Sequence, residues 1–242
     1  MLLRLAPAKL ICCALYVVLS VLVAGCDRAP ASSDYFPLAS GQHWTYTETT
    51  ERDNGTRSQR TLRLDNLGQD RLDDEPAWHR YSDDGMHYWL RSDDSGTYRV
   101  ASRFELDEFY TPDASRRYVL KQPLSVGTSW QADTAPYLLE RAQQFPPEIR
   151  HTHPAVPMVY RIEATDEAVD TGAGRFEHCL RVQGVAALHL YVDATSGWKD
   201  LPLITREWYC PGVGLVRLSR EEHTASSFVT GGTLTLDLQS WP

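Results

Sequence analysis

The chain has 242 residues, and its 24 Lys and Arg residues stand against 32 Asp and Glu residues, which gives a formal net charge of −8. An acidic protein has little with which to neutralise phosphate groups, so the composition argues against nucleic-acid binding. The sequence also lacks a basic stripe for anionic lipid, so membrane attachment has to come from another feature.

The first 25 residues have the layout of a secretory signal peptide. Arg4 and Lys9 are the only charged residues before Asp27, and residues 10–23 form an apolar run. A short basic region, an apolar stretch and small residues before a cleavage point define such a signal. The run is shorter than the roughly 20 residues of a permanent transmembrane helix, so we expect cleavage rather than an uncleaved anchor.

Residues 22–26, with the sequence LVAGC, resemble the lipobox of bacterial lipoproteins. The resemblance implies lipid attachment to Cys26, cleavage after Gly25 and acylation of the new amino terminus. Several acyl chains give stable anchoring, because each buried methylene contributes roughly 0.8 kcal/mol. We therefore expect a lipid-anchored protein of the cell envelope that faces the periplasm. Asp27 resembles an inner-membrane retention signal, which favours the inner membrane.

The mature chain divides into a tether and one domain. Residues 26–33 carry the lipidated Cys26 and a short polar stretch with one proline, and such a stretch reaches at most ~25–30 Å. Residues 34–242 are enough for one substantial core. Loss of Arg4 and Lys9 leaves 22 Lys and Arg residues against 32 Asp and Glu residues, so the mature charge is −10.

From residue 34 onward the patterns are those of antiparallel strands. Residues 44–49 are aromatic and β-branched, and Asn54-Gly55 is a strong hairpin turn. Turn residues then recur between aromatic runs at a spacing of about ten residues. The predicted strands are 44–49, 57–64, 77–81, 86–91, 97–100, 118–122, 158–164, 176–182, 187–192, 203–209, 215–220 and 233–238.

Helical periodicity is scarce. Residues 104–110 and 137–144 could each form a short helix, the second with Pro136 near its first turn, and residues 145–157 should be a long loop. We therefore predict an all-β domain. Its antiparallel sheet should be a closed or half-closed barrel around an aromatic-rich core, with at most short helices.

A pattern P-L-x-x-G-x-x-W occurs twice, 86 residues apart. Each copy holds a proline, a glycine and a tryptophan at the same spacing: Pro37, Gly41 and Trp44, then Pro123, Gly127 and Trp130. Proline and glycine shape a turn, and a large aromatic side chain usually serves packing. The pattern favours the same structural turn used twice, each time followed by a tryptophan that packs in the core. The alternative is that the two copies form two equivalent entrances to a binding site.

Two cysteines, Cys179 and Cys210, remain after Cys12 and Cys13 leave with the signal and Cys26 is lipidated. An even pair in an oxidising compartment indicates a disulfide. Two buried free thiols are the alternative, because a sequence does not show whether two Cα atoms approach.

Residues 35–46, 174–182 and 209–216 together are similar to a loose group of uncharacterised exported bacterial proteins, many of them lipoproteins. The group implies no activity, and the similar segments cover about a quarter of the mature chain. In the last segment, Pro211, Gly212 and Gly214 predict a turn that launches the strand at 215–220.

Motifs for catalysis or metal binding are weak. Ser196 and Lys199 have the S-x-x-K spacing of the nucleophile and base in penicillin-interacting enzymes, but residues 193–197 are typical of a turn between strands. The partner motifs S-D-N and K-T-G are missing from the sequence. His151 and His153 are weak metal candidates flanked by prolines. Adjacent carboxylates at 73–74, 83–84 and 93–94 indicate turns rather than calcium loops. We assign no catalytic residue, no metal and no cofactor.

The sequence leaves three functions open. The first is a non-enzymatic envelope module that binds an apolar ligand, a lipid or another envelope protein. The second is a hydrolase that acts on an envelope polymer or a small ester, and the third is a purely structural role. A concave, water-free pocket favours binding, a cleft with a buried titratable cluster favours an enzyme, and a fully packed barrel favours structure. The sequence does not indicate an oligomeric state.

Overall fold

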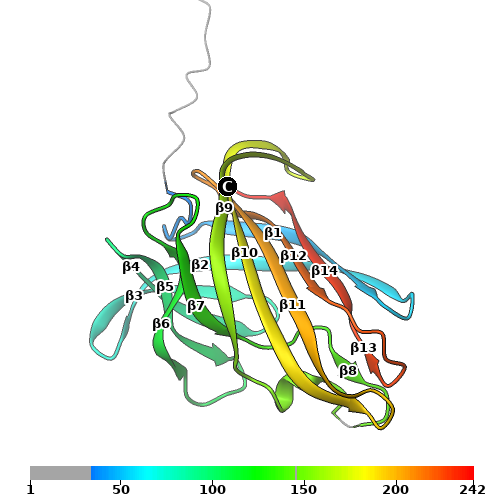
Figure 1. Ribbon diagram of the computed structural model, residues 1–242. Coiled ribbons are helices and arrows are strands. Elements are labelled where there is room, and N and C mark those ends of the chain that lie inside the picture. Colours follow the sequence, from blue (N-terminus) through cyan, green and yellow to red (C-terminus); the bar gives the residue numbers. More distant parts are fainter. Residues whose placement is uncertain (1–33, 145) are drawn as a thin grey trace, which may run out of the picture. The chain divides into compact units, whose positions relative to one another are not determined.

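The computed structural model describes residues 34–144 and 146–242. The predicted signal peptide, the lipidated Cys26 and the tether lie outside the described residues. The described part is almost entirely β-structure, with one short 3-10 helix and no α-helix (Figure 1). No helix in this part is long and apolar enough to cross a membrane.

Fourteen strands are defined in the described residues. The first seven are β1 (His43–Arg52), β2 (Arg57–Leu72), β3 (Glu75–Ser82), β4 (Met86–Asp93), β5 (Gly96–Phe104), β6 (Thr111–Lys121) and β7 (Ser129–Thr134). The next four are β8 (Glu140–Arg141), β9 (Val156–Thr171), β10 (Gly174–Asp193) and β11 (Gly197–Cys210). The last three are β12 (Gly214–Glu222), β13 (Val229–Thr230) and β14 (Gly232–Ser240), and the 3-10 helix η1 spans Ile149–His151.

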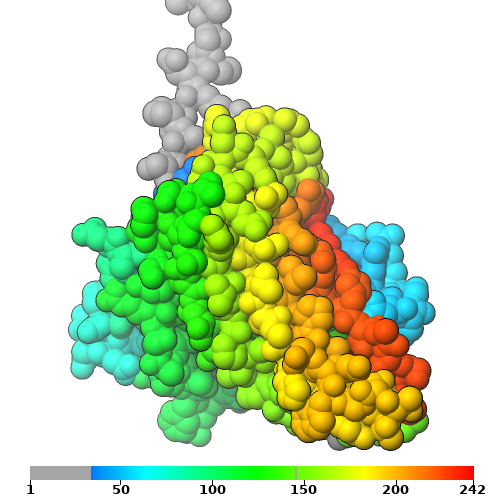
Figure 2. All heavy atoms as spheres, viewed as in Figure 1, coloured from blue at the N-terminus to red at the C-terminus, as the bar shows by residue number. Residues whose placement is uncertain are grey.

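Twelve strands form one antiparallel sheet in the order β6-β5-β4-β3-β2-β1-β14-β12-β11-β10-β9-β7. The strands of the second half lie side by side as adjacent bands from green to red in Figure 2. At the edges, Arg117 Nε of β6 donates to Asp133 O of β7, and Trp130 Nε1 of β7 donates to Tyr118 O of β6, each at 3.1 Å. These bonds nearly close the sheet into a barrel, so the predicted fold class is confirmed.

The register places alternate side chains of each strand in the interior. In β9, Val156, Met158, Tyr160 and Ile162 are buried while the residues between them are exposed. This alternation matches the period of two expected of a strand with one buried face. The predicted strands at 176–182 and 187–192 are one continuous strand, β10, because Gly184 and Ala186 continue the buried face between them.

Two segments pack against opposite ends of β12. Pro37 lies beside Gly214 at the start of that strand, and the backbone of residues 137–139 binds Glu222 at its last position. Phe36 and Leu38 of the first segment, and Leu139 and Ile149 of the second, belong to the main hydrophobic core. Each end of β12 is thus contacted by chain that is not part of the twelve-stranded sheet.

Both predicted helices are wrong. Residues 104–110 end β5 and turn into β6, with Leu106 and Phe109 exposed, so no apolar face is buried that could hold a helix there. Residues 137–144 consist of bends and a turn on either side of β8, which pairs with β13. The amide groups of this segment bind the Glu222 carboxylate instead of helical carbonyls. The predicted loop at 145–157 contains η1 and the first residues of β9.

The two copies of P-L-x-x-G-x-x-W have equivalent geometry. Gly41 and Gly127 have φ angles of 81° and 96°, a region that favours glycine, and each donates its N–H to a carbonyl of a neighbouring strand. Each glycine is followed by a strand with a buried tryptophan. Trp44 Nε1 donates to Val213 O, and Trp130 Nε1 donates to Tyr118 O. Each copy therefore fixes the start of a strand, β1 or β7, through one indole.

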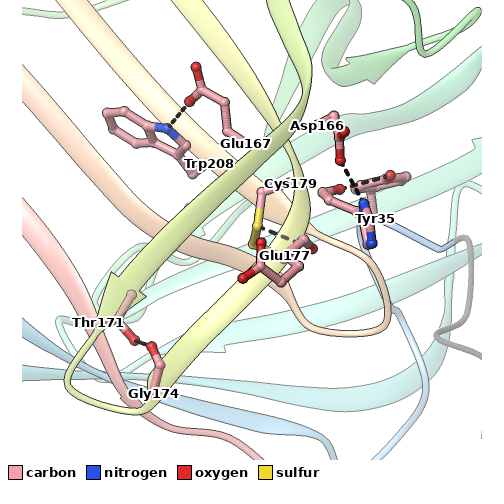
Figure 3. The surroundings of a disulfide bond; sticks show 10 residues. Tyr35, Asp166, Glu167, Thr171, Gly174, Glu177, Cys179 and Trp208 are labelled. Carbon is pink, nitrogen blue, oxygen red and sulfur yellow. Dashed lines mark hydrogen bonds and ion pairs between the residues drawn. A yellow bond between two sulfur atoms is a disulfide. The ribbon is translucent and has the colours of Figure 1, made fainter.

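Cys179 of β10 and Cys210 of β11 form a disulfide, with Cα atoms 4.2 Å apart. The two strands are already paired beside it, since Leu180 faces Tyr209. Figure 3 shows the surroundings of the bond, where Trp208 Nε1 donates to Glu167 at 2.8 Å. The bridge therefore ties together two neighbouring strands at the end where β10 begins and β11 ends.

Removing the bridge should lower stability. Replacing both cysteines, Cys179→Ala with Cys210→Ala, should reduce the free energy of unfolding by about 3–4 kcal/mol, because the covalent link no longer restricts the unfolded chain. The melting temperature should fall by roughly 10 °C. Calorimetry of the variant and of the reduced wild-type protein should agree. An unchanged melting curve in both would show that the bridge does not contribute.

Candidate ligand site in the barrel interior

Polar side chains of β11 face the interior of the barrel. On β11, Thr205 and Glu207 share the inward face with Leu203 and Tyr209, and the register places Thr205 opposite Gly184 of β10 and Arg220 of β12. A β-carbon at Gly184 would meet Thr205, Met158 and Tyr160, so these side chains lie together inside. A fold that needed only a packed core would place apolar residues here.

Four interior side chains from four strands form what we call the interior polar cluster: Tyr88 of β4, Arg117 of β6, Tyr160 of β9 and Glu207 of β11. The charge of Arg117 acts on the pKa values of the other three, and the charge of Glu207 acts on Tyr160. Tyr88 faces inward because it pairs with the buried Arg80. The cluster therefore contains residues from both the first half of the sheet, β4 and β6, and the second half, β9 and β11.

Several polar groups of the cluster have no partner among the described residues. Arg117 donates through Nε to Asp133 O, but it forms no ion pair there. The hydroxyls of Tyr88 and Tyr160 form no hydrogen bond with any described residue. Glu207 differs, since it accepts a hydrogen bond from Tyr209 at 2.5 Å and has the Thr205 hydroxyl at 3.5 Å.

Burial sets the protonation of the cluster. Burial raises the pKa values of Tyr88 and Tyr160 well above the usual range, so both hydroxyls keep their protons and act as donors. Burial also raises the pKa of Glu207, against the opposing effects of the Tyr209 hydroxyl and Arg117. The cluster thus presents the Arg117 guanidinium group, two protonated hydroxyl groups and the Glu207 carboxyl group to the interior.

An apolar wall stands beside Glu207. The register places Glu207 opposite Leu218 of β12, Leu218 opposite Leu236 of β14, and Leu234 opposite Arg220. These three leucines share the inward face, yet each keeps part of its surface exposed. Inward-facing leucines of a filled barrel would be fully buried, as Leu203 and Leu238 are. Solvent therefore reaches the interior beside the cluster.

The other interior cations have partners. Arg99 forms an ion pair with Asp113 at 2.6 Å. Arg220 forms one with Glu222 at 2.7 Å, and both side chains are almost completely buried. Arg80 has no ion pair, but its guanidinium group lies over the rings of Phe36 and Trp44 and donates to Asn66 and Pro37. These groups hold the fold together, in contrast to Arg117.

Two depressions on the surface, of about 300 and 410 Å³, are open to solvent and lie near the ends of β3 and β4. Both are bordered by Glu75 and Arg91, which form an ion pair at 2.6 Å. Neither is lined by a member of the interior polar cluster. Their charged groups have protein partners, since Arg99 pairs with Asp113 and Arg116 with Asp93, so we prefer the interior as the ligand site.

The structure brings Cys179 and Cys210 together, but it does not combine the weak metal and catalytic candidates of the sequence into a site. His151 lies 3.5 Å from Glu148, and His153 contacts Thr152. No group of three or more metal-ligating side chains occurs in residues 34–144 and 146–242. Ser196 lies in the turn between β10 and β11, and Lys199 is in β11, where it pairs with Leu190. Pro211, Gly212 and Gly214 form the turn between β11 and β12, and Cys26 is outside the described residues.

Sequence reasoning missed the interior polar cluster. One signal was available, because the predicted strand at 203–209 alternates so that Thr205 and Glu207 share a face with Leu203 and Tyr209. A polar pair on the apolar face of a strand indicates a functional or paired site. No comparable signal marks Tyr88, Arg117 or Tyr160, which become neighbours only through the closure of the barrel.

No family model matches the chain, and no curated protein matches it. Two solved structures are similar in fold. One is a candidate lipoprotein of Parabacteroides distasonis ATCC 8503, with 14% identity and a TM-score of 0.40 over 88% of this chain and 100% of that one. The other is a candidate exported protein of Bacteroides fragilis NCTC 9343 with a YmcC-like fold. It has 11% identity and a TM-score of 0.36, again over 88% and 100%. Similarity at this level does not transfer a function.

Proposed function

We propose that the protein is a lipid-anchored component of the bacterial envelope that binds a small, partly apolar ligand inside its barrel. The anchoring rests on the signal-like residues 1–25 and the lipobox-like segment that ends at Cys26. The binding role rests on one observation, a set of interior donors that have no acceptor among the described residues: the two terminal nitrogens of Arg117 and the hydroxyls of Tyr88 and Tyr160. None of these atoms is among the fully buried unpartnered polar atoms of the described residues, so solvent reaches them and a ligand can take its place.

Two further features support binding over a purely structural role. Leu218, Leu234 and Leu236 face the interior and keep part of their surface accessible, which is apolar surface that a ligand could cover. A tether of residues 26–33 would also keep this interior close to the bilayer, where apolar ligands are plentiful. A purely structural barrel would gain stability by packing these positions.

The hydrolase alternative draws on Glu207, whose carboxyl has a raised pKa. A nucleophile needs a base within hydrogen-bond reach and access to its substrate. The Thr205 hydroxyl is at the limit of that reach, 3.5 Å from Glu207, and Thr205 is buried. The shorter contact, from Tyr209, holds the carboxyl group in place. We therefore favour binding over hydrolysis.

Membrane attachment should depend on Cys26. Cells that express Cys26→Ser should accumulate unprocessed or unlipidated protein, because the thiol that receives the lipid is lost. Labelling with an alkyne fatty acid and separation of membranes from the soluble fraction would measure this. Normal acyl labelling of Cys26→Ser would contradict the assignment, whereas Cys179→Ser should still be labelled.

Binding should be saturable and confined to the interior. A fluorescent fatty acid should bind the exported, unlipidated protein at micromolar concentration. Leu218→Trp should weaken that binding by about tenfold or more, because the larger ring occupies inward space. Ser219→Trp is the matched control, since Ser219 is the next residue on β12 and faces the other way. Equal affinity in both variants would place the ligand outside the barrel.

A further inference from the structure

Arg117 is a half-buried cation that has neither a carboxylate partner nor a stacked aromatic ring among the described residues. No carboxylate oxygen of the described residues lies within 4.0 Å of Arg117 nitrogen, although Arg99 and Arg220 both have carboxylate partners. Arg117 is half-buried, so solvent still reaches part of its side chain, and a partly desolvated guanidinium group is stabilised by a paired anion. Arg117 is therefore either hydrated or matched by something that is not part of the described chain.

Glu207 does not fill this role. Its two carboxyl oxygens face Tyr209 and Thr205 rather than the guanidinium group. Arg117 uses Nε on the carbonyl of Asp133, so the two terminal nitrogens of its planar fork stay free of described partners. Those two nitrogens are the ones that bind the paired oxygens of a carboxylate or a phosphate.

The groups around Arg117 also favour an anionic ligand. The hydroxyls of Tyr88 and Tyr160 have no acceptor among the described residues, and both stay protonated. A guanidinium group with two hydroxyl donors favours an anionic group over a neutral one. On the neighbouring strands, the half-buried Leu218, Leu234 and Leu236 offer an apolar surface on the same interior face.

We propose that the interior site takes an amphiphile with an anionic headgroup. Its carboxylate or phosphate oxygens would bind the Arg117 guanidinium group and the hydroxyls of Tyr88 and Tyr160, and its chain would lie against Leu218, Leu234 and Leu236. This inference rests on the proposed function, which it narrows from a partly apolar ligand to an acidic one. A carboxylate and a phosphate would bind the same donors through their oxygens. A competition experiment with one amphiphile of each kind distinguishes them.

The test uses the mature, lipidated protein in phosphatidylcholine vesicles. A photoreactive palmitic acid labels the interior strands, and mass spectrometry of peptides measures the yield. Palmitic acid, hexadecyl phosphate, hexadecanol and inorganic phosphate compete with the label. One of the two anionic amphiphiles should compete at least about tenfold better than hexadecanol, and the better one identifies the headgroup. Inorganic phosphate, without a chain, should not compete.

Arg117→Gln should remove the advantage of the anionic competitors, while Arg116→Gln should keep it. Arg116 is the next residue on β6 and pairs with Asp93 at 2.8 Å, so it controls for loss of a charge. If Arg117→Gln does not fold, the variant with Tyr88→Phe and Tyr160→Phe replaces it and should reduce the same advantage.

Equal competition by hexadecanol and the acids, unaffected by Arg117→Gln, would overturn the headgroup proposal and leave the interior site standing. Absence of saturable labelling on the interior strands would overturn the interior site as well. The two failures are therefore distinguishable.

Discussion

Replacing Glu222 with glutamine should reduce the free energy of unfolding by about 3–5 kcal/mol, the usual cost of leaving a buried charge without its partner. The Glu222 carboxylate accepts the Arg220 Nε–H and the backbone N–H groups of Tyr137, Leu138 and Leu139. Glutamine keeps one acceptor oxygen, and its amide nitrogen would face donors. Urea unfolding followed by tryptophan fluorescence would measure the loss.

Glu221→Gln is the matched control. Glu221 pairs with Arg206 at 2.5 Å, but both side chains are about one-third exposed, so its loss should cost less than about 1 kcal/mol. The double variant Arg220→Met with Glu222→Leu should also be less stable than the wild type, because the N–H groups of residues 137–139 lose their acceptor although no charge is left unmatched. Equal stability of Glu222→Gln and Glu221→Gln would show that the buried pair does not hold the end of the barrel.

Truncating either repeated tryptophan should have an effect of similar size. Trp44 and Trp130 are 2% and 6% exposed, and loss of a buried tryptophan side chain costs roughly 3–5 kcal/mol. Trp44→Ala and Trp130→Ala should each melt far below the wild type, because each indole also donates to a carbonyl of another segment. Thermal unfolding followed by circular dichroism is the measurement.

Trp198→Ala provides the comparison for this pair. Trp198 is 62% exposed, so its removal should shift the melting temperature little. If Trp44→Ala or Trp130→Ala melted like the wild type and lost ligand binding, the repeat would form a functional surface. That result would favour two entrances to a binding site over two structural turns.

The strands could be predicted because their signals are local. The alternation of Leu234, Leu236 and Leu238 with polar residues predicts a half-buried strand, and β14 is that strand. The turn at Asn54-Gly55 likewise needs only its own residues to be recognised. Such patterns define an antiparallel sheet and a barrel without any knowledge of contacts between distant parts of the chain.

The wrong helices and the missed cluster have a common cause, which is contact between segments far apart in sequence. Residues 137–139 are not helical because Glu222, more than 80 residues later, accepts their amide hydrogens. Arg117 and Glu207 become neighbours through closure of the sheet between β6 and β7. Pairing of this kind leaves no period in the local sequence, so pattern reasoning does not find it.

The most direct test of the central claim is the stability of the mature protein as a long-chain fatty acid is added. A ligand that binds the folded barrel at 100 times its Kd should raise the free energy of unfolding by about 2.7 kcal/mol, by mass action alone. We predict this rise in urea unfolding of the wild type and of Ser219→Trp, and its loss in Leu218→Trp. A free energy of unfolding that stays constant across the titration in all three proteins would contradict a ligand site in the interior.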